Sequence, residues 1–263
     1  MRISKNILLK EIPFEARDCH ALELYLSEMA AKGWMLDEIW IFNIFKFKRC
    51  EPKNLRFAVD IPRLSDTCPD TSLQNYELLF NEYIEICESS GWKHIVEDSE
   101  YQIFCTEDIN VVDIQTDDSL KLDSLLKINS GYLIQMLSFF FLAMTWGKNN
   151  PTIESYSYGK LCMTIFYSSI TFFFGLNFLE DLLWKLSAKK SLKEGNIVKY
   201  PGLSSFKIKL LIQKYDSVAI IILLVGIFIL QNENQIIYLI LAFSIGFIIL
   251  TIMLLVNIIK NHS

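Results

Sequence analysis

The feature that most constrains the fold is a stretch of 19 residues, from Ile128 to Trp146, without a charged side chain. A helix of this length is about as long as the hydrocarbon core of a bilayer is thick, roughly 30 Å. Similar apolar stretches follow it. Together they predict transmembrane helices over residues 128–146, 161–184, 217–232 and 236–259. We therefore expect residues 128–263 to form an all-α, four-helix transmembrane bundle.

Charge divides the chain in the same place. Residues 1–127 contain 14 Lys and Arg against 24 Asp and Glu, whereas residues 128–263 contain 11 basic and 6 acidic residues. An acidic half followed by an apolar half is typical of a globular domain joined to membrane helices. The acidic half has no dense basic patch, so we expect no nucleic-acid partner.

The distribution of lysines predicts the orientation in the membrane. Eight lysines lie between Lys185 and Asp216, whereas residues 231–235 contain none. Because basic residues near span ends stay on the cytoplasmic side, both termini are expected in the cytoplasm. The sequence thus predicts a multi-pass protein of the cell membrane, with the lipid bilayer as a partner.

An internal repeat organises the acidic half. Apolar residues with the spacing of one helix face precede Gly33-Trp34, and the same pattern precedes Gly91-Trp92, 58 residues later. The two stripes are Leu22, Tyr25, Leu26 and Met29, and Phe80, Tyr83, Ile84 and Cys87. Each predicts an amphipathic helix that ends at a glycine cap.

Strand-like segments flank both helices. They cover residues 7–12, 34–42 and 44–48 around the first helix, and residues 56–61, 92–96 and 101–105 around the second. The order is therefore strand, helix, strand, strand, twice. The expected fold class is α+β, with two helices on one face of a six-stranded, mostly antiparallel sheet. This cytoplasmic domain is expected over residues 1–108, and residues 109–127 form a tether.

Several motifs occur in the order found in one bacterial family. They are the segment Glu28–Leu36, Phe45-Lys46-Phe47, Arg56–Asp60 and the second Gly91-Trp92. Over about residues 10–106 the chain resembles domain-of-unknown-function family 2812. The resemblance implies a soluble Gly-Trp repeat domain followed by transmembrane helices, and genomic neighbours that are often PadR-like regulators. It implies no established activity and no catalytic residues.

The sequence contains no recognisable catalytic or metal signature. Its six cysteines include no C-x-x-C pair, and free thiols are expected. Phosphate loops, G-x-S-x-G and H-E-x-x-H are absent. Neither the adjacent Cys19 and His20 nor His94 is expected to form a catalytic pair. We predict no catalytic, cofactor-binding or metal-binding residues, and no enzyme activity.

Two further patterns leave alternatives open. The repeated Gly-Trp places a tryptophan in the core, or alternatively in a cleft between the repeats. Glu180 and Asp181 are expected as an interfacial pair beside lysines, although acidic groups in apolar segments can also mark a functional pathway. Ala242 and Gly246 permit close helix packing, and hence a homo-oligomer.

Three functions are compatible with these features. The first is a regulatory or sensory protein whose cytoplasmic domain binds a protein partner or a small ligand. The second is an accessory or immunity-type subunit of a membrane transporter. The third, a membrane enzyme, requires Glu180 and Asp181 to act chemically.

Overall fold

The computed structural model of the chain describes residues 4–12, 15–40, 43–62, 73–97, 101–115, 118–127, 131–148, 156–215, 240, 243–246 and 248–256. The chain divides into two compact units. The first comprises Met1–Asn129 and Ser187–Phe206, and the second comprises Ser130–Leu186 and Lys207–Ser263. The backbone therefore passes between the units three times.

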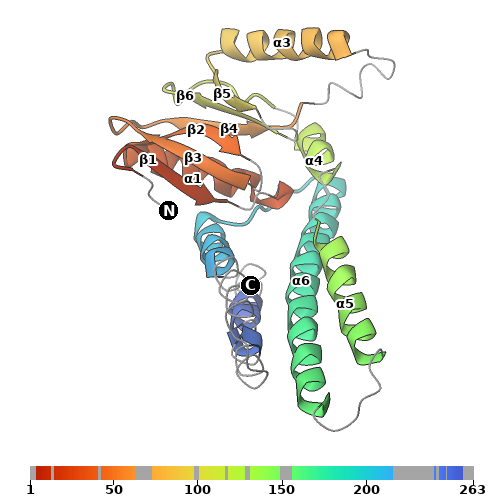
Figure 1. The fold of residues 1–263 in the computed structure, drawn as a ribbon. Helices are drawn as coiled ribbons and strands as arrows, with labels where there is room; N and C mark the ends of the chain where they lie inside the picture. The colour runs from red at the N-terminus through yellow and green to blue at the C-terminus, as the bar shows by residue number, and fades with distance from the viewer. Residues whose placement is uncertain are drawn as a thin grey trace. The chain divides into compact units, whose positions relative to one another are not determined.

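The first unit contains two copies of one element order (Figure 1). The first copy consists of β1 (Ile7–Glu11), α1 (Cys19–Ala31), β2 (Trp34–Trp40) and β3 (Ile44–Arg49), with a short helix η1 (Ala16–Asp18) before α1. The second consists of β4 (Arg56–Asp60), α3 (Leu73–Ser89), β5 (Lys93–Glu97) and β6 (Gln102–Thr106). Helix α4 (Asp118–Lys127) follows, within the segment expected to be a tether.

The strands form two antiparallel, three-stranded sheets with the same topology, β1-β3-β2 and β4-β6-β5. Both contain an irregularity at the same place. The register shifts between Leu36 and Glu38 in the first sheet, and between His94 and Val96 in the second. Each shift begins two residues after the tryptophan of Gly-Trp. The two repeats therefore share the details of their backbone as well as their order.

The expectation of one six-stranded sheet is wrong. The third strand of each repeat lies in the centre of its own sheet and pairs on both sides within that repeat. Helix α1 packs against β4 of the second repeat as well as β2 of its own. The two repeats are joined by the contact of α1 with β4 and by that of β2 with β5, neither of which local sequence patterns encode.

Two glycines end the repeat helices. Gly33 has a φ of 77° and Gly91 a φ of 96°, in the left-handed region that disfavours other residues. The Gly33 N–H donates to the Ala30 carbonyl at 2.9 Å. A Cβ on Gly33 would lie 2.8 Å from the Cys50 carbonyl oxygen. Glycine is therefore required here by both φ and space.

The core of the first unit lies on both sides of the second sheet. Helix α1 buries one face, including Leu22 and Leu26, and Phe57 and Val59 of β4 are also buried. Helix α3 lies against β5 (Figure 1). Cys87 of α3 packs there in a cluster with Trp92 and Phe104. Strand β4 lies at the edge of the second sheet. Its C-terminal end is close to the N-terminal turns of α1.

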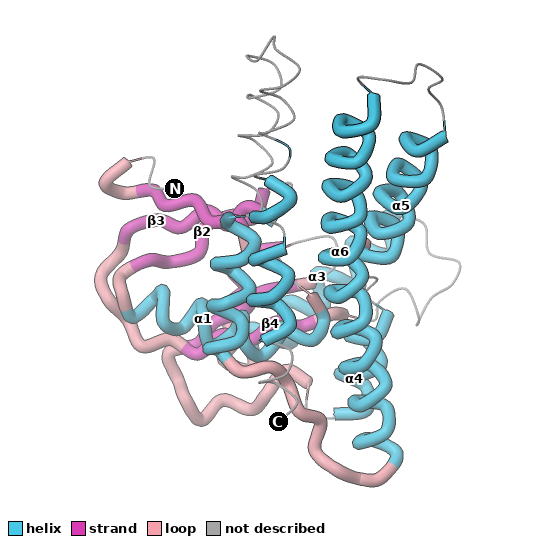
Figure 2. The backbone as a smooth tube through the Cα atoms, turned by 90° about the horizontal axis from the view of Figure 1, so that it is seen from below, coloured by secondary structure: helices cyan, strands magenta, loops and turns pink. Residues whose placement is uncertain are grey.

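In the second unit, α5 (Tyr132–Lys148) lies beside α6 (Tyr156–Lys193), as Figures 1 and 2 show. The ring of Phe139 contacts the rings of Tyr167 and Phe174, with centroids 6.5 and 5.7 Å apart. The last turns of α6, from Ser187, belong to the first unit. Aromatic contacts thus hold the helix pair together.

The predicted four-helix transmembrane bundle is also wrong. Among the described residues, no helix combines the length and the apolar character needed to cross a membrane. Helix α5 has 17 residues, about 26 Å at 1.5 Å per residue, which is shorter than a hydrocarbon core of roughly 30 Å. Helix α6 is longer but buries the polar side chains of Asn177, Glu180 and Asp181 among its apolar residues.

Two of the four expected spans lie partly or wholly beyond this test. Residues 217–232 lie outside the described residues, and residues 236–259 are described only in part. The expected cell-membrane location, with both termini in the cytoplasm, rests on the same spans and stays a prediction.

Candidate functional site

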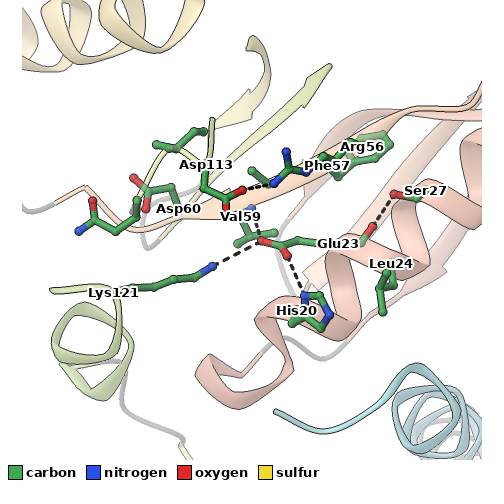
Figure 3. A pocket seen from close by; sticks show the side chains of 13 residues that line it. His20, Glu23, Leu24, Ser27, Arg56, Phe57, Val59, Asp60, Asp113 and Lys121 are labelled. Atoms are coloured by element: carbon green, nitrogen blue, oxygen red, sulfur yellow. Dashed lines mark hydrogen bonds and ion pairs between the residues drawn. The ribbon is translucent and has the colours of Figure 1, made fainter. Parts of the chain in front are cut away.

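A polar cavity of about 230 Å³ lies in the first unit between α1, β4, α4 and the segment that precedes α4 (Figure 3). It is lined by residues from both repeats. They are His20, Glu23, Leu24, Ser27, Arg56, Phe57, Ala58, Val59, Asp60, Asp113, Ile114, Gln115 and Lys121. Six of these side chains are ionisable, so the cavity is lined by charged groups of both signs.

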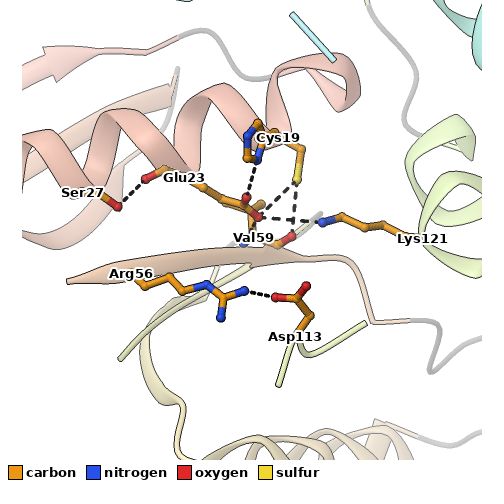
Figure 4. A network of polar contacts seen from close by, with 8 residues as sticks. Cys19, Glu23, Ser27, Arg56, Val59, Asp113 and Lys121 are labelled. Carbon is orange, nitrogen blue, oxygen red and sulfur yellow. Dashed lines mark hydrogen bonds and ion pairs between the residues drawn. The ribbon is translucent and has the colours of Figure 1, made fainter. Parts of the chain in front are cut away.

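Glu23 lies at the centre of the α1 wall. Its Oε1 accepts a hydrogen bond from the Val59 N–H at 3.0 Å, and its Oε2 lies 3.3 Å from His20 Nδ1. His20 and Glu23 are three residues apart, so they share one face of the helix. The carboxylate of Glu23 therefore links α1 to the backbone of β4 (Figure 4).

Cys19 and His20 are adjacent in the sequence, but their side chains contact different oxygens of Glu23. The Cys19 thiol donates to the Val59 carbonyl at 3.4 Å and also lies 4.0 Å from Glu23 Oε1. Burial raises the pKa of Cys19 well above its ordinary value, and the charge of Glu23 raises it further. The thiol is thus held protonated, a form unsuited to nucleophilic attack. The hydrogen bond to Glu23 raises the pKa of His20.

Lys121 extends from α4 toward Glu23 (Figure 3). Its Nζ lies 4.0 Å from Glu23 Oε1, which is too long for a direct hydrogen bond. Burial lowers the pKa of Lys121, but the nearby groups, chiefly Cys19 and Glu23, outweigh burial and raise it overall. Lys121 is therefore a cation that faces the cavity with donor capacity for a ligand.

Asp60, at the end of β4, is a partly buried acid of the site. Its Oδ2 accepts a hydrogen bond from the Tyr83 hydroxyl of α3 at 2.6 Å. Burial raises the pKa of Asp60. The pKa of Tyr83 is raised as well, first by burial and then by the charge of Asp60. The two groups join α3 to the cavity wall.

Arg56 fixes the segment that leads into α4. It forms an ion pair with Asp113 (Figure 4). Its Nη1 also donates to the Val111 carbonyl at 2.7 Å. Its guanidinium lies 5.3 Å from the centroid of the Trp92 ring, whose Nε1 donates to the Val112 carbonyl at 2.9 Å. The second Gly-Trp motif thus positions one wall of the cavity.

The cleft hypothesis for the Gly-Trp motifs is partly realised. A second cavity, of about 470 Å³, is lined by Gly91 and Trp92 together with Ala30 and Met35 of the first repeat. Trp92 nevertheless remains 2 % exposed and packs against the core. The ring of Trp34 instead lies beneath the guanidinium of Arg49, at 5.1 Å. Trp92 is therefore a core residue that also borders a cavity, whereas Trp34 is only partly buried.

The other residues singled out lie elsewhere. His94 Nε2 lies 3.0 Å from Gln102 Oε1 in the second sheet. Glu180 and Asp181 are buried in the second unit, where Asp181 forms an ion pair with Lys185 at 3.0 Å. A Cβ on Gly246 would meet no atom within 4 Å among the described residues, whereas Ala242 lies outside them.

Four cysteines are described, Cys19, Cys50, Cys87 and Cys105, and all are free thiols. Cys68 lies outside the described residues, and the side chain of Cys162 is not described. Within the described part of the chain, no three His, Cys, Asp or Glu residues are placed to hold a metal ion.

Sequence reasoning missed the residues that give the cavity its charge. Lys121 lies in the expected tether, and Asp60 ends a strand whose alternation indicates an ordinary half-buried segment. One signal was available, because Leu122 and Leu125 are three residues apart and both are buried. That spacing is typical of a helix that packs by one face.

Comparison with known proteins gives one match, and it covers this site. No curated protein and no solved structure matches the chain. A family model matches residues 18–137, which include both repeats from α1 onward, α4 and every residue that lines the polar cavity. Residues 18–137 therefore match the family described as Protein of unknown function (DUF2812), the family that the motifs resemble.

Proposed function

We propose that the first unit is a regulatory domain whose polar cavity binds a small ligand. The observation that carries the proposal is Lys121, a cation on α4 that faces the cavity without a carboxylate at hydrogen-bonding distance in the described part of the chain. Ionisable groups with shifted pKa values in a cavity are typical of functional sites. Here His20, Asp60 and Lys121 are such groups.

The position of α4 in the chain supports a regulatory role. Helix α4 ends at Lys127, and the second unit begins at Ser130. A ligand held by Lys121 on one side and by α1 or β4 on the other would favour one placement of α4. A ligand shifts an equilibrium only through such a difference in affinity between two states. Occupancy of the cavity can thus be passed along the chain to the second unit.

Thermal unfolding of the full-length protein with a library of small polar metabolites tests the proposal. A true ligand raises the melting temperature, because it binds the folded state alone. The rise should be lost in Lys121→Gln. It should persist in Lys32→Gln, which removes a lysine whose side chain is 64 % exposed and pairs with Glu28. The proposal fails if no compound stabilises the protein, or if both variants respond like the wild type.

A further inference from the structure

Four of the six ionisable side chains of the polar cavity form two pairs, and the other two have no charged partner at hydrogen-bonding distance among the described residues. Arg56 is paired with Asp113, and His20 Nδ1 lies 3.3 Å from Glu23 Oε2. The remaining two, Lys121 and Asp60, have opposite charges. They enter from different elements, α4 and the end of β4 (Figure 3).

Lys121 and Asp60 are too far apart to satisfy each other. In the described part of the chain, the carboxylate oxygen within 4.0 Å of Lys121 Nζ is Glu23 Oε1, and Asp60 forms no ion pair of that length. Glu23 is itself engaged, because it accepts the Val59 N–H and faces His20. An ammonium of Lys121 with three donors is therefore available to an anionic group of a ligand.

The carboxylate of Asp60 has no cationic partner within 4.0 Å among the described residues. Its contact with Tyr83 is a hydrogen bond from a neutral hydroxyl, which offsets burial of the carboxylate only in part. A ligand with a cationic group beside Asp60 would supply the missing charge. An anion alone would instead bring like charge toward Asp60, and a cation alone would bring like charge toward Lys121.

The cavity limits the size of the molecule. Its volume of about 230 Å³ lies below the roughly 300–1,000 Å³ of typical small-molecule sites. Both charged groups of the ligand must fit within this space, so they must be close together in the molecule. Leu24 and Phe57 supply apolar surface for the remainder.

We infer that the cavity binds a small zwitterion of the α-amino-acid class. Its carboxylate accepts hydrogen bonds from Lys121, and its ammonium donates to Asp60. The α-carbon places these two charges side by side, which matches two protein groups of opposite sign that do not reach each other. This inference rests on the proposed function and specifies its ligand.

Calorimetric titration of the full-length protein tests the inference. The probes are the twenty proteinogenic L-amino acids, tested singly. For the tightest of them, the carboxylic acid without the amino group and the amine without the carboxylate are tested too. The wild type should bind the amino acid at least about tenfold more tightly than either analogue, because each analogue leaves one protein charge unpaired.

Two variants should lose affinity for different probes. Lys121→Gln should weaken binding of the amino acid and of the carboxylic acid by about tenfold or more, with little effect on the amine. Asp60→Asn should weaken binding of the amino acid and of the amine, with little effect on the carboxylic acid. Lys32→Gln, on the exposed end of α1, should leave all three affinities unchanged.

The outcomes separate this inference from the proposed function. If the carboxylic acid binds the wild type as tightly as the amino acid, the zwitterion is wrong and ligand binding by the cavity stands. The same holds if only a ligand of another class, found by the thermal screen, requires Lys121. If no compound binds, both proposals fail. The comparison of the three probes on the wild type decides the matter even if a variant does not fold.

Discussion

Glu23 is the residue on which the other groups of the polar cavity converge. Its carboxylate accepts the Val59 N–H, faces His20 at 3.3 Å and has Lys121 at 4.0 Å. Glu23→Gln keeps the shape but removes the charge between two cations. We expect it to lower the free energy of unfolding by about 1–3 kcal/mol, measured by denaturant titration.

Glu28→Gln is the matched control, because Glu28 lies on the same helix in an exposed i, i+4 pair with Lys32 at 3.2 Å. Surface pairs contribute little, so its effect should be within about 0.5 kcal/mol. Equal losses in the two variants would show that Glu23 has no special role.

The titration of His20 gives a pH dependence with a definite sign. Its hydrogen bond to Glu23 raises the pKa of His20, so the folded state binds this proton more tightly than the unfolded state. The stabilisation is therefore complete below the unfolded-state pKa of about 6.5 and is lost as pH rises through the folded-state value. The difference in unfolding free energy between wild type and His20→Asn should therefore shrink as the pH rises above about 6.5. A difference that stays constant would contradict the pairing.

The ionisation of Asp60 also makes the protein less stable as pH rises, because burial raises the pKa of Asp60. The neutral carboxyl is favoured in the folded state, so ionisation of Asp60 destabilises the protein above the folded-state pKa. Asp60→Asn keeps an acceptor for Tyr83 and removes that charge. Without ligand, the variant should be more stable than the wild type at about pH 7 and equal to it near pH 3, below the unfolded-state pKa of about 3.9. Asp123→Asn, at an exposed position of α4, should show no such crossover.

At the scale of elements, the glycine at the end of α1 combines strain and crowding. Gly33 has a positive φ, and a Cβ there would lie 2.8 Å from the Cys50 carbonyl oxygen. Gly33→Ala should therefore destabilise the first unit by more than the roughly 1 kcal/mol that a left-handed conformation costs alone. Thermal or chemical unfolding measures the loss.

Two glycines of the same unit serve as controls. Gly195 has a φ of 68° with no atom within 4 Å of a Cβ, so Gly195→Ala reports strain alone. Gly202 has neither feature, so Gly202→Ala should change stability by no more than about 0.5 kcal/mol. If Gly33→Ala and Gly195→Ala lose equal stability, crowding by Cys50 is unimportant.

The elements of the repeat were predictable because their signals are local. Each of the six expected strands lies within two residues of an observed strand, and both Gly-Trp motifs follow a helix. A two-residue alternation or a glycine cap needs only a few neighbouring residues to be recognised.

The grouping of strands and the site were not predictable, because they depend on contacts between distant segments. Helix α1 lies against β4, and Lys121 comes within 4.0 Å of Glu23, almost one hundred residues away in the chain. No local pattern specifies either contact. The sequence shows which cavity residues are charged, but it does not show which distant residues they contact.

At the scale of the whole molecule, the first unit is discontinuous. Residues 187–206 return to it, and Phe206 is 1 % exposed with its ring centroid 5.8 Å from that of Tyr25. A fragment of residues 1–129 should therefore be less stable than one in which residues 187–206 are joined to it by a Gly/Ser linker. The difference should include about 1.5–3 kcal/mol for burial of Phe206, measured by chemical unfolding.

Phe206→Ala in the joined fragment should remove much of that gain. A fragment of residues 1–129 that is as stable as the joined form would show that the returning segment is not part of the folding unit.

The return of residues 187–206 also governs when the protein can fold during its synthesis. A domain that is contiguous in sequence can fold as soon as its last residue leaves the ribosome. Here translation must continue from residue 130 to residue 206 before the first unit is complete, roughly 4–15 s at about 5–20 residues per second. During that interval Tyr25 lacks its contact with Phe206, so the nascent chain exposes this apolar surface for longer than a contiguous domain would.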